Sequence, residues 1–472
     1  KAHHQLKEFL SRKRLVQIPE LLEAEYAITA PVKYYDHHYC HATSAYFTSN
    51  YDEALVVTLD GGGDGLSGSV YRGENGRLTR LAVVDSFNSL GNFYSYITHL
   101  CGFKAESHEG KITGLAALGK PAYINILREF VSYKDPGQIQ YSVPMYHRSA
   151  LKQIAGRLPA DFEKADLAAS VQLLLEEIGI EFICFWLRKT RIRSMAVAGG
   201  VFSNVKFNQR VHELKEVDNF FVHPAMDDSG LAVGGAFAAL AQEPGTDPPR
   251  LLKRLKNVYL GTQYGDDEIH ACIEAFGFHA TYEAEITNVV AKLLAEGHVV
   301  ARFTGRMEYG PRALGHRSIL YQTTDPSIND WLNAHLLRTE FMPFAPATLQ
   351  EYADECFEGL DGARDTARFM TITFHCTEKM RAQSPGVVHV DGTARPQILD
   401  PETAPDLYQI AKKYHELTGI PSLINTSFNM HGEPIVCTPE DALRSFKQGK
   451  LDYLAIGHWL VVNPEMKRNG KS

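Results

Sequence analysis

The sequence contains no hydrophobic run long enough to cross a membrane. Its longest stretch of small and apolar residues, 231–241, is far shorter than the ~20 residues that a transmembrane helix needs. Cysteine is also scarce, because the chain has only 7 and no two of them form a CxxC pair. The sequence therefore predicts neither a disulfide framework nor a thiolate zinc site, and it favours a reducing, cytoplasmic location.

Positive charge is not in excess either. The 48 lysines and arginines are outnumbered by 56 aspartates and glutamates, which gives a formal net charge of −8. This balance disfavours a protein that binds nucleic acid through its phosphate backbone, although local basic clusters can still bind a small anion. The remaining composition is that of a globular protein, and 472 residues allow roughly two to four domains.

Proline marks the place where we expect the chain to divide. Residues 243–249 read EPGTDPP and follow directly after an alanine-rich helix signal. Because proline ends helices and stiffens linkers, we predict a first domain over residues 1–246 and a second over residues 247–472. A surface loop is the alternative interpretation of the same segment.

Strand and helix signals alternate along the chain. In the first half, strands are predicted over residues 53–60, 66–71, 78–85, 194–198 and 220–222, and helices over 165–187, from about 202, and over 229–240. In the second half, helices are predicted over 286–296, 407–418 and 440–448, and strands over 298–303, 369–374 and 422–425. A capping box with proline at the first helical position is predicted at residues 438–441. Strands that end in glycine loops before helices predict an α/β fold whose loops hold phosphates.

The densest group of metal-binding side-chain types is Asp-His-His-Tyr-Cys-His at residues 36–41. Asp36 suits a helix N-cap, and on the following helix His37 and His41 present their imidazoles on one face. Such a pair is a common way to hold a metal, although a solvated histidine pair explains the spacing equally simply.

Three further segments combine glycine with polar side chains. Asp60 ends a predicted strand just before GGGDG, where a carboxylate beside free backbone N–H groups suits a metal that touches a nucleotide phosphate. Asp228 lies before a helix of small residues, and Gly199-Gly200 followed by Asn204 is typical of a nucleotide loop. Taken singly, these residues are also explained as a turn aspartate, an N-cap and a tight turn.

Taken in order, the motifs resemble the actin-like ATPase superfamily, in its metal-binding threonylcarbamoyl-transferase branch. More closely, they resemble the O-carbamoyltransferase family of nodulation proteins and antibiotic (cephamycin, aminoglycoside) tailoring enzymes. The segments that carry the resemblance are HHYCHA (37–42), LDGGGDG (59–65), SLGNFY (89–94), EGKITGLAALG (109–119), AGGVFSN (198–204), DDSGLAVGGA (227–236), GRMEYGPRALGHRSIL (305–320), RTEFMPFAP (338–346), HVDGTARPQ (389–397) and INTSFNMHGEPIV (424–436). One departure is the family's first strand and loop, which has no counterpart here. The chain opens inside a basic amphipathic pattern, so we expect the native chain to start upstream.

The resemblance implies an actin-like (ASKHA) α/β domain, residues 1–246, followed by an α/β YrdC-like domain, residues 247–472. It implies that carbamoyl phosphate and ATP, with Mg²⁺, are converted to carbamoyl-adenylate in the second domain. The first domain then transfers the carbamoyl group to a hydroxyl of a small molecule. The metal ligands implied are His37, His41, Asp60 and Asp228, and this mixed nitrogen and oxygen set suits iron, manganese or zinc, with iron favoured by the resemblance.

The remaining site residues follow the same division. The nucleotide or carbamoyl-adenylate residues of the first domain are Asp60, Gly61, Gly62, Gly91, Gly199, Gly200, Asn204 and Asp228. Two polyanions must meet in the second domain, which requires fixed cations. The residues assigned to that site are Arg306, Arg312, Arg317, Arg338, Arg395, Asn425 and Thr426. Asp60, Asp228 and Arg306 are the predicted catalytic residues.

Three alternatives remain open from the sequence. A sugar or acid kinase of the actin-like fold needs neither HxxxH nor a second site of arginines. A tRNA threonylcarbamoyl-transferase is disfavoured by the net charge of −8. A non-catalytic nucleotide-binding scaffold is disfavoured because the four metal-ligand types are intact. The acceptor and the oligomeric state are not predicted.

Overall fold

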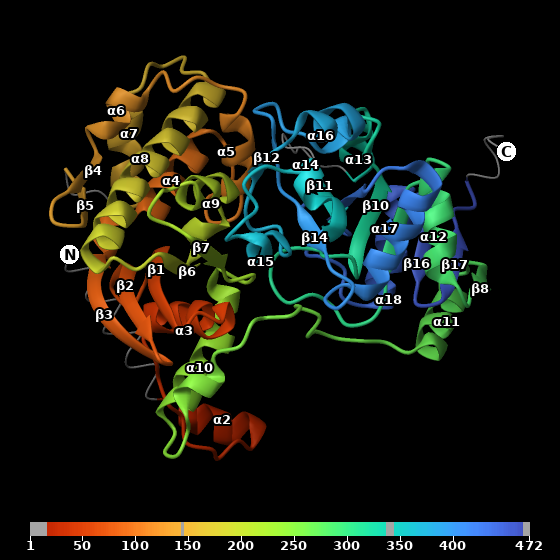
Figure 1. Cartoon of the computed structure of the whole chain (residues 1–472), viewed down its shortest axis with the longest axis horizontal. Helices are drawn as coiled ribbons and strands as arrows, with labels where there is room; N and C mark the ends of the chain where they lie inside the picture. The colour runs from red at the N-terminus through yellow and green to blue at the C-terminus, as the bar shows by residue number, and fades with distance from the viewer. Residues whose placement is uncertain (1–16, 143–145, 337–343, 466–472) are drawn as a thin grey trace.

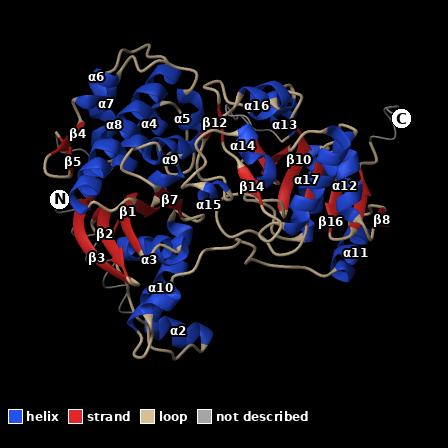
Figure 2. Ribbon diagram, viewed as in Figure 1, coloured by secondary structure: helices blue, strands red, loops and turns tan. Residues whose placement is uncertain are grey.

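The computed structural model describes residues 17–142, 146–336 and 344–465 (Figure 1). It is a mixed α/β structure, as the sequence predicted, with a five-stranded sheet, an eight-stranded sheet and two small two-stranded sheets (Figure 2). The last strand of the five-stranded sheet ends at residue 222, and the first strand of the eight-stranded sheet begins at residue 280. The predicted domain boundary near residue 247 falls between them and stays a prediction.

The five-stranded sheet has the order β3-β2-β1-β6-β7. Its strands are β1 (Glu53–Gly63), β2 (Leu66–Glu74), β3 (Arg77–Asp85), β6 (Ser194–Ala198) and β7 (Asn219–Val222). The first three form an antiparallel meander, and β6 and β7 pair in parallel with β1 and with each other. Both faces are covered, by α4 (Leu90–Leu100) and α8 (Lys164–Thr190) on one side and by α3 (His37–Ser49) and α10 (Leu231–Gln242) on the other (Figure 1).

Strand β1 explains how this sheet is buried on two sides. Successive strand residues point to opposite faces, and here Leu55 and Val57 join the core beneath α4 and α8. Their neighbours Ala54 and Val56 pack against α3 instead. Strand β1 therefore needs a continuous apolar run. This run fixes the register of the strand and, with it, the position of Asp60.

The eight-stranded sheet has the order β14-β11-β15-β10-β9-β16-β17-β8. Its strands are β8 (Ala280–Tyr282), β9 (Val300–Phe303), β10 (Arg317–Gln322), β11 (Ala345–Leu349), β14 (Gln397–Leu399), β15 (Ser422–Ser427), β16 (Tyr453–Ile456) and β17 (Trp459–Val462). Helices α12 (Ile286–Ala295) and α17 (Pro405–Thr418) share one core with Val300 and Leu320 of the sheet. Helices α11 (Asp266–Ala275) and α18 (Pro439–Gly449) lie in the other core, with Ala301 and Phe303.

Shorter elements connect and flank the sheets. They are α2 (Ile18–Tyr26), α5 (Glu109–Ala116), α6 (Ile124–Arg128), β4 (Val131–Lys134), β5 (Gln138–Tyr141), α7 (Arg148–Ala155), α9 (Val205–His212), α13 (Ile328–His335), α14 (Ala353–Cys356), α15 (Arg364–Ala367), β12 (Phe374–His375), α16 (Glu378–Gln383) and β13 (Thr393–Ala394). Single 3₁₀ turns precede α9 and α10, at Gly200–Ser203 and Asp228–Gly230. Among the described residues, no helix combines the length and apolarity required to cross a bilayer.

Most of the predicted elements are confirmed, including the capping box, in which Thr438 and Asp441 bond reciprocally at the start of α18. The strand predicted over residues 369–374 is wrong, because only Phe374 of that segment belongs to a strand. Its apolar side chains are buried as expected, but Met370 has a φ of 56° and Thr373 donates its backbone N–H to the Val205 carbonyl. The segment thus packs against α9 instead of joining a sheet.

Candidate metal and nucleotide site

Helix α3 positions the two histidines of the candidate metal site. Asp36 caps the helix, because its Oδ1 accepts the Tyr39 backbone N–H at 2.8 Å. One turn of helix separates His37 and His41, and their Nε2 atoms lie 3.2 Å apart. His41 is completely buried. The local HxxxH pattern therefore brings two imidazole nitrogens to one spot.

Asp60 reaches the same spot from the end of the buried part of β1. Its Oδ1 accepts the backbone N–H of Gly200 at 2.9 Å. Its Oδ2 lies 3.1 Å from His37 Nε2 and 3.8 Å from His41 Nε2. A side chain at position 200 would place its Cβ 2.8 Å from Asp60 Oδ1. Glycine at this position thus lets the backbone hold one carboxylate oxygen while the other faces the histidines.

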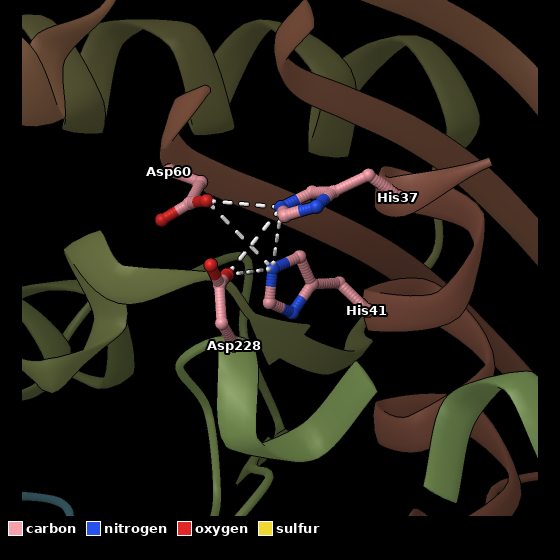
Figure 3. Close-up of side chains that lie close together, drawn as sticks. All are labelled: His37, His41, Asp60 and Asp228. Carbon is pink, nitrogen blue, oxygen red and sulfur yellow. Dashed lines mark hydrogen bonds and ion pairs between the residues drawn. The ribbon is translucent and has the colours of Figure 1, made fainter. Parts of the chain in front are cut away.

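Asp228 completes the group from the loop before α10. Its Oδ1 lies 3.5 Å from the Nε2 atoms of both His37 and His41, and its side chain is 70% exposed. One ligand atom from each of the four residues lies within 4.8 Å of the other three (Figure 3). The structure therefore brings together all four residues assigned to the metal; that they bind one stays a prediction.

The spacing of these four ligand atoms suits a metal ion. With bonds of ~2.1 Å to nitrogen and oxygen, ligand atoms lie ~3.0 Å apart at right angles and ~3.4 Å apart at the tetrahedral angle. Five distances join the histidine Nε2 atoms to each other and to the carboxylate oxygens. They are 3.1 to 3.8 Å, which is close to that range. Two imidazoles and two carboxylates are also the donor set expected for iron, manganese or zinc.

The electrostatics of the group keep its carboxylate charged. Burial acts to raise the pKa of Asp60, but hydrogen bonds from His37 and His41 outweigh it and lower the pKa well below the usual range. Burial acts to lower the pKa of His41, and the carboxylates of Asp228 and Asp60 reverse this and raise it. The hydrogen bonds from the two imidazoles thus favour the charged form of Asp60, which is the form that binds a divalent cation.

The glycines assigned to nucleotide binding surround Asp60. A Cβ on Gly91, at the start of α4, would lie 2.9 Å from the Asp60 carbonyl oxygen. Gly61 offers its carbonyl to the side chain of Asn92 at 2.8 Å. Gly199 has a φ of 103° and contacts the backbone of Leu59, and Gly62 has a φ of 154°. The structure thus places Gly200 against the Asp60 carboxylate and Gly91 against the Asp60 carbonyl, whereas Gly199 lies against Leu59, and Gly61 and Gly62 follow Asp60 in the chain.

Asn204 links this loop to a cavity of about 260 Å³. As the N-cap of α9 it accepts the Phe207 backbone N–H, and its Nδ2 bonds to Thr113 and Gln172, both of which line the cavity. Apolar side chains of α5 and α8 form one wall, and residues 389–393 of the second half form another.

Sequence reasoning missed this cavity and the ion pair at its mouth. Lys206 Nζ lies 2.8 Å from Asp391 Oδ2, and the two residues are far apart in the chain. The available sequence signals were the motifs at 109–119 and 389–397. Neither motif indicates that the two segments lie side by side in the fold.

Two of the predicted arginines of the second half have different surroundings. Arg306 is exposed and donates to the Leu260 carbonyl at 2.9 Å. Arg317 is completely buried, stacks on Phe303 at 3.7 Å, and donates to the carbonyls of Thr304, His316, Thr262 and Gly305. A contact between Arg317 and a bound anion would require this side chain to leave those carbonyls. In the structure Arg317 therefore holds the loop, and its predicted place in the anion site stays a prediction.

The other predicted residues of the second half lie on neighbouring segments. Asn425 of β15 is buried and donates to Gln397 Oε1 at 2.7 Å and to the Ala313 carbonyl at 3.3 Å. Thr426 follows it in β15, and Arg395 precedes β14 and is close enough to His389 to affect its pKa. Arg338 lies outside the described residues.

Glu308 organises the loop that carries three of these arginines, and sequence reasoning missed it. Its Oε1 accepts the backbone N–H groups of Leu314, His316 and Arg317 at 2.7, 2.8 and 3.3 Å. Because one buried carboxylate oxygen holds three amides, the loop from 305 to 317 folds back on itself before β10 begins.

His316 in this loop gives a prediction on pH dependence. It stacks on Tyr259 with ring centroids 3.7 Å apart, and burial, aided by Arg302, lowers its pKa from 6.5 to about 4. A group with a lowered pKa contributes full stability above pH ~6.5 and loses it as pH falls toward 4, because the unfolded chain then binds the extra proton. We expect His316→Phe, which keeps the stacked ring, to reduce the loss of unfolding free energy between pH 7 and 4.5 by up to ~3 kcal/mol. Urea titrations at the two pH values measure this, and an unchanged pH dependence would contradict it.

Comparison with known proteins identifies the family. Residues 5–237 match the family model described as Carbamoyltransferase N-terminus, and residues 291–463 match Carbamoyltransferase C-terminus. The chain is 34% identical over 436 residues to nodulation protein NolO of Bradyrhizobium diazoefficiens, covering 90% of this chain and 78% of that protein. It is also 34% identical over 455 residues to an uncharacterised protein of Methanocaldococcus jannaschii, covering 91% and 74%. The chain belongs to the carbamoyltransferase family, which confirms the predicted resemblance and identifies a transferase.

Two further comparisons complete this result. Nodulation protein U of Sinorhizobium fredii is 30% identical over 427 residues, with 84% of this chain and 73% of that protein covered. Among solved structures, full-length HypF in the phosphate- and nucleotide-bound form has a TM-score of 0.34 and 15% identity, and 47% of this chain and 45% of that chain are covered. This structural similarity is too low to carry an argument, so the family rests on the sequence matches.

Proposed function

We propose that the protein is an ATP-dependent O-carbamoyltransferase. It converts carbamoyl phosphate, ATP and one water molecule to carbamoyl-adenylate, pyrophosphate and phosphate, and then transfers the carbamoyl group to a hydroxyl of a small molecule such as an antibiotic or a sugar. The observation that carries this proposal is the convergence of His37, His41, Asp60 and Asp228 beside glycine loops in a chain of the carbamoyltransferase family.

The first half is proposed as the transfer domain, an actin-like domain over residues 1–246. His37, His41, Asp60 and Asp228 would hold the divalent metal, with iron favoured over manganese or zinc. When bound, this ion supplies a Lewis acid that orients and polarises the phosphate side of the carbamoyl donor. The backbone N–H groups of the glycine loops then hold phosphate oxygens that Asp60 itself would repel.

The cavity beside Asn204 is proposed to take the nucleoside of the adenylate. Its lining residues Thr113 and Gln172 bond to Asn204, four residues after Gly200, so the loop after β6 contacts both Asp60 and the wall of this cavity. Its small apolar residues and its amide and hydroxyl groups suit a base and a ribose, and Glu176, Lys206 and Asp391 add charged groups to the lining.

The second half is proposed as the YrdC-like activation domain, over residues 247–472. Arg306, Arg338 and Arg395 would neutralise carbamoyl phosphate and the phosphates of MgATP, with Asn425 and Thr426 nearby. Fixed guanidinium groups suit this task because they stay charged and bind phosphate oxygens in pairs. Arg317 supports the loop that carries Arg306.

The proposal is tested by assaying the two half-reactions separately. The wild-type chain is expected to release pyrophosphate from ATP only when carbamoyl phosphate is present, and mass spectrometry with a pool of hydroxylated acceptors is expected to find a carbamoyl ester. Acceptor-dependent ADP release in place of pyrophosphate would favour an actin-fold kinase. Carbamoylation or threonylcarbamoylation confined to tRNA would favour the tRNA-modifying alternative.

Arg395→Ala tests the place of activation. We expect pyrophosphate release to fall roughly a hundredfold, since loss of one fixed cation at a charged transition state commonly costs ~3 kcal/mol. Transfer from supplied carbamoyl-adenylate is expected to persist, because that step belongs to the other half. Arg444→Ala, which removes an exposed arginine that pairs with Glu433, is the matched control. Full pyrophosphate release by Arg395→Ala would remove this residue from the site.

A further inference from the structure

The loop that carries Arg306 and Arg312 lies against the segment of the first half that leads to Asp228. Gly310 has a φ of 100°, and a Cβ there would lie 3.0 Å from the Pro224 carbonyl oxygen and 3.4 Å from Ala225 Cα. Glycine therefore permits a backbone contact between the two halves three to four residues before Asp228. A loop assigned from its sequence to the second half thus reaches the candidate metal site of the first.

A side-chain contact fixes the loop on the helix of the metal ligands. The Tyr309 hydroxyl lies 3.2 Å from His223 Nε2, and His223 Nδ1 lies 3.0 Å from Thr48 Oγ1. Thr48 belongs to α3, which also carries His37 and His41. His223 and Thr48 are buried, so this connection passes through the interior.

Arg312 follows this contact by three residues and is partly buried. Its Nε is buried and has no hydrogen-bond partner among the residues that the structure describes. Burial lowers the pKa of Arg312, and the negative charge of Asp227, the neighbour of Asp228, acts to raise it. Asp227 in turn accepts bonds from Ser229. A buried guanidinium donor without an acceptor is costly, and an anionic ligand is the group that would satisfy it.

We propose that Arg312 belongs to the transfer site and not to the activation site, and that it binds the phosphate of carbamoyl-adenylate beside the four-residue metal group. This inference rests on the proposed function, because it assigns a residue to one of its two half-reactions. It makes the second half a contributor to the chemistry of the first, through the contacts of Tyr309 and Gly310.

The chemistry of transfer requires a cation at this place. A bond forms between the acceptor oxygen and the carbamoyl carbon, the bond from that carbon to the bridging phosphate oxygen breaks, and the electron pair leaves on AMP. The hydroxyl proton passes to solvent. The phosphate group of the adenylate carries one negative charge and that of released AMP carries two, so the transition state gains negative charge at the phosphate. Two carboxylates already balance a divalent ion, and a fixed guanidinium stabilises the additional charge.

The kinetic test compares Arg312→Ala, Arg312→Lys and Arg306→Ala in the full chain. We expect Arg312→Ala to slow transfer from supplied carbamoyl-adenylate by about a hundredfold and to leave pyrophosphate release within about twofold. Arg312→Lys keeps the charge and is expected to recover part of the transfer rate. Arg306→Ala is expected to show the opposite pattern. Slowed pyrophosphate release with normal transfer in Arg312→Ala would overturn the inference, and so would equal loss of both.

A binding test does not depend on turnover. Calorimetric titration of AMP into the Mn²⁺-loaded chain is expected to show at least tenfold weaker binding for Arg312→Ala than for the wild type. The bound Mn²⁺ and the melting temperature should stay unchanged. Arg188→Ala removes an exposed arginine of the first half that pairs with Glu216, and it serves as the matched control. If Arg312→Ala bound AMP as tightly as the wild type does, this inference alone would be overturned. A wild-type chain that binds no AMP would overturn the proposed nucleotide function together with it.

Discussion

The His41→Ala chain is expected to lose its metal and its transfer activity while it still releases pyrophosphate from ATP and carbamoyl phosphate. His41 is the buried member of the group, and its Nε2 lies 3.2 Å from His37, 3.8 Å from Asp60 and 3.5 Å from Asp228. Removal of this nitrogen leaves three ligands, one of them largely exposed, so metal content should fall well below one ion per chain. Transfer is expected to fall by at least ~10³-fold, or ~4 kcal/mol of transition-state stabilisation.

His38→Ala is the matched control for this experiment. His38 lies on the same helix, is equally buried, and bonds through Nδ1 to Thr58 Oγ1 at 2.8 Å, but it contributes no atom to the group of four. It should therefore lose stability without loss of metal. Elemental analysis, pyrophosphate release and product formation are measured in both variants. Full metal content in His41→Ala, or equal loss of metal in His38→Ala, would contradict the assignment of the ligands.

The convergence of the metal group was predictable because it depends on local geometry. The i, i+4 spacing of His37 and His41 places them on one face of any α-helix, and Asp36 ensures that the helix begins there. Asp60 directly follows the fully buried part of β1, whose register the apolar run fixes. Asp228 required more than local pattern, since the family resemblance identified it as the fourth ligand.

The surroundings of the arginines in the second half were less predictable, because the charge of an arginine does not determine which groups it contacts. Arg317 and Arg306 lie in one motif, yet the first donates to four backbone carbonyls and the second is exposed. Glu308 accepts three backbone N–H groups of the loop that carries both arginines, including that of Arg317. The strand predicted over 369–374 failed for a related reason, because burial by α9 and burial in a sheet favour the same apolar residues.

Contacts between the halves could not be read from either half alone. Lys206 and Asp391 are 185 residues apart, and Tyr309 and His223 are 86 apart. Within its own segment, the sequence around each of these side chains is equally consistent with a solvent-exposed residue. The packed structure shows that Lys206 and Asp391 meet at the cavity and that Tyr309 contacts His223, so the two halves touch at both places.

Gly199→Ala is expected to destabilise the first half by about 4 kcal/mol and to abolish metal and nucleotide binding together. The residue has a φ of 103°, and its N–H donates to the Met226 carbonyl at 2.6 Å. A Cβ there would lie 2.2 Å from the Leu59 carbonyl oxygen, an atom of the sheet that cannot move aside. Backbone strain costs ~1–3 kcal/mol and the added atom a similar amount. The loop must therefore shift, which moves the Gly200 N–H away from Asp60.

Gly110→Ala provides the contrast, because a Cβ at that position meets nothing within 4 Å and the residue lies in α5. This variant should unfold at the same urea concentration as the wild type or slightly higher, since alanine favours a helix by ~1 kcal/mol over glycine. Trp186 of α8 reports on the first half during the titration, and Mn²⁺ binding is measured on the folded chain. If Gly199→Ala matched Gly110→Ala in both measurements, the contact between the glycine loop and β1 would not hold the site together.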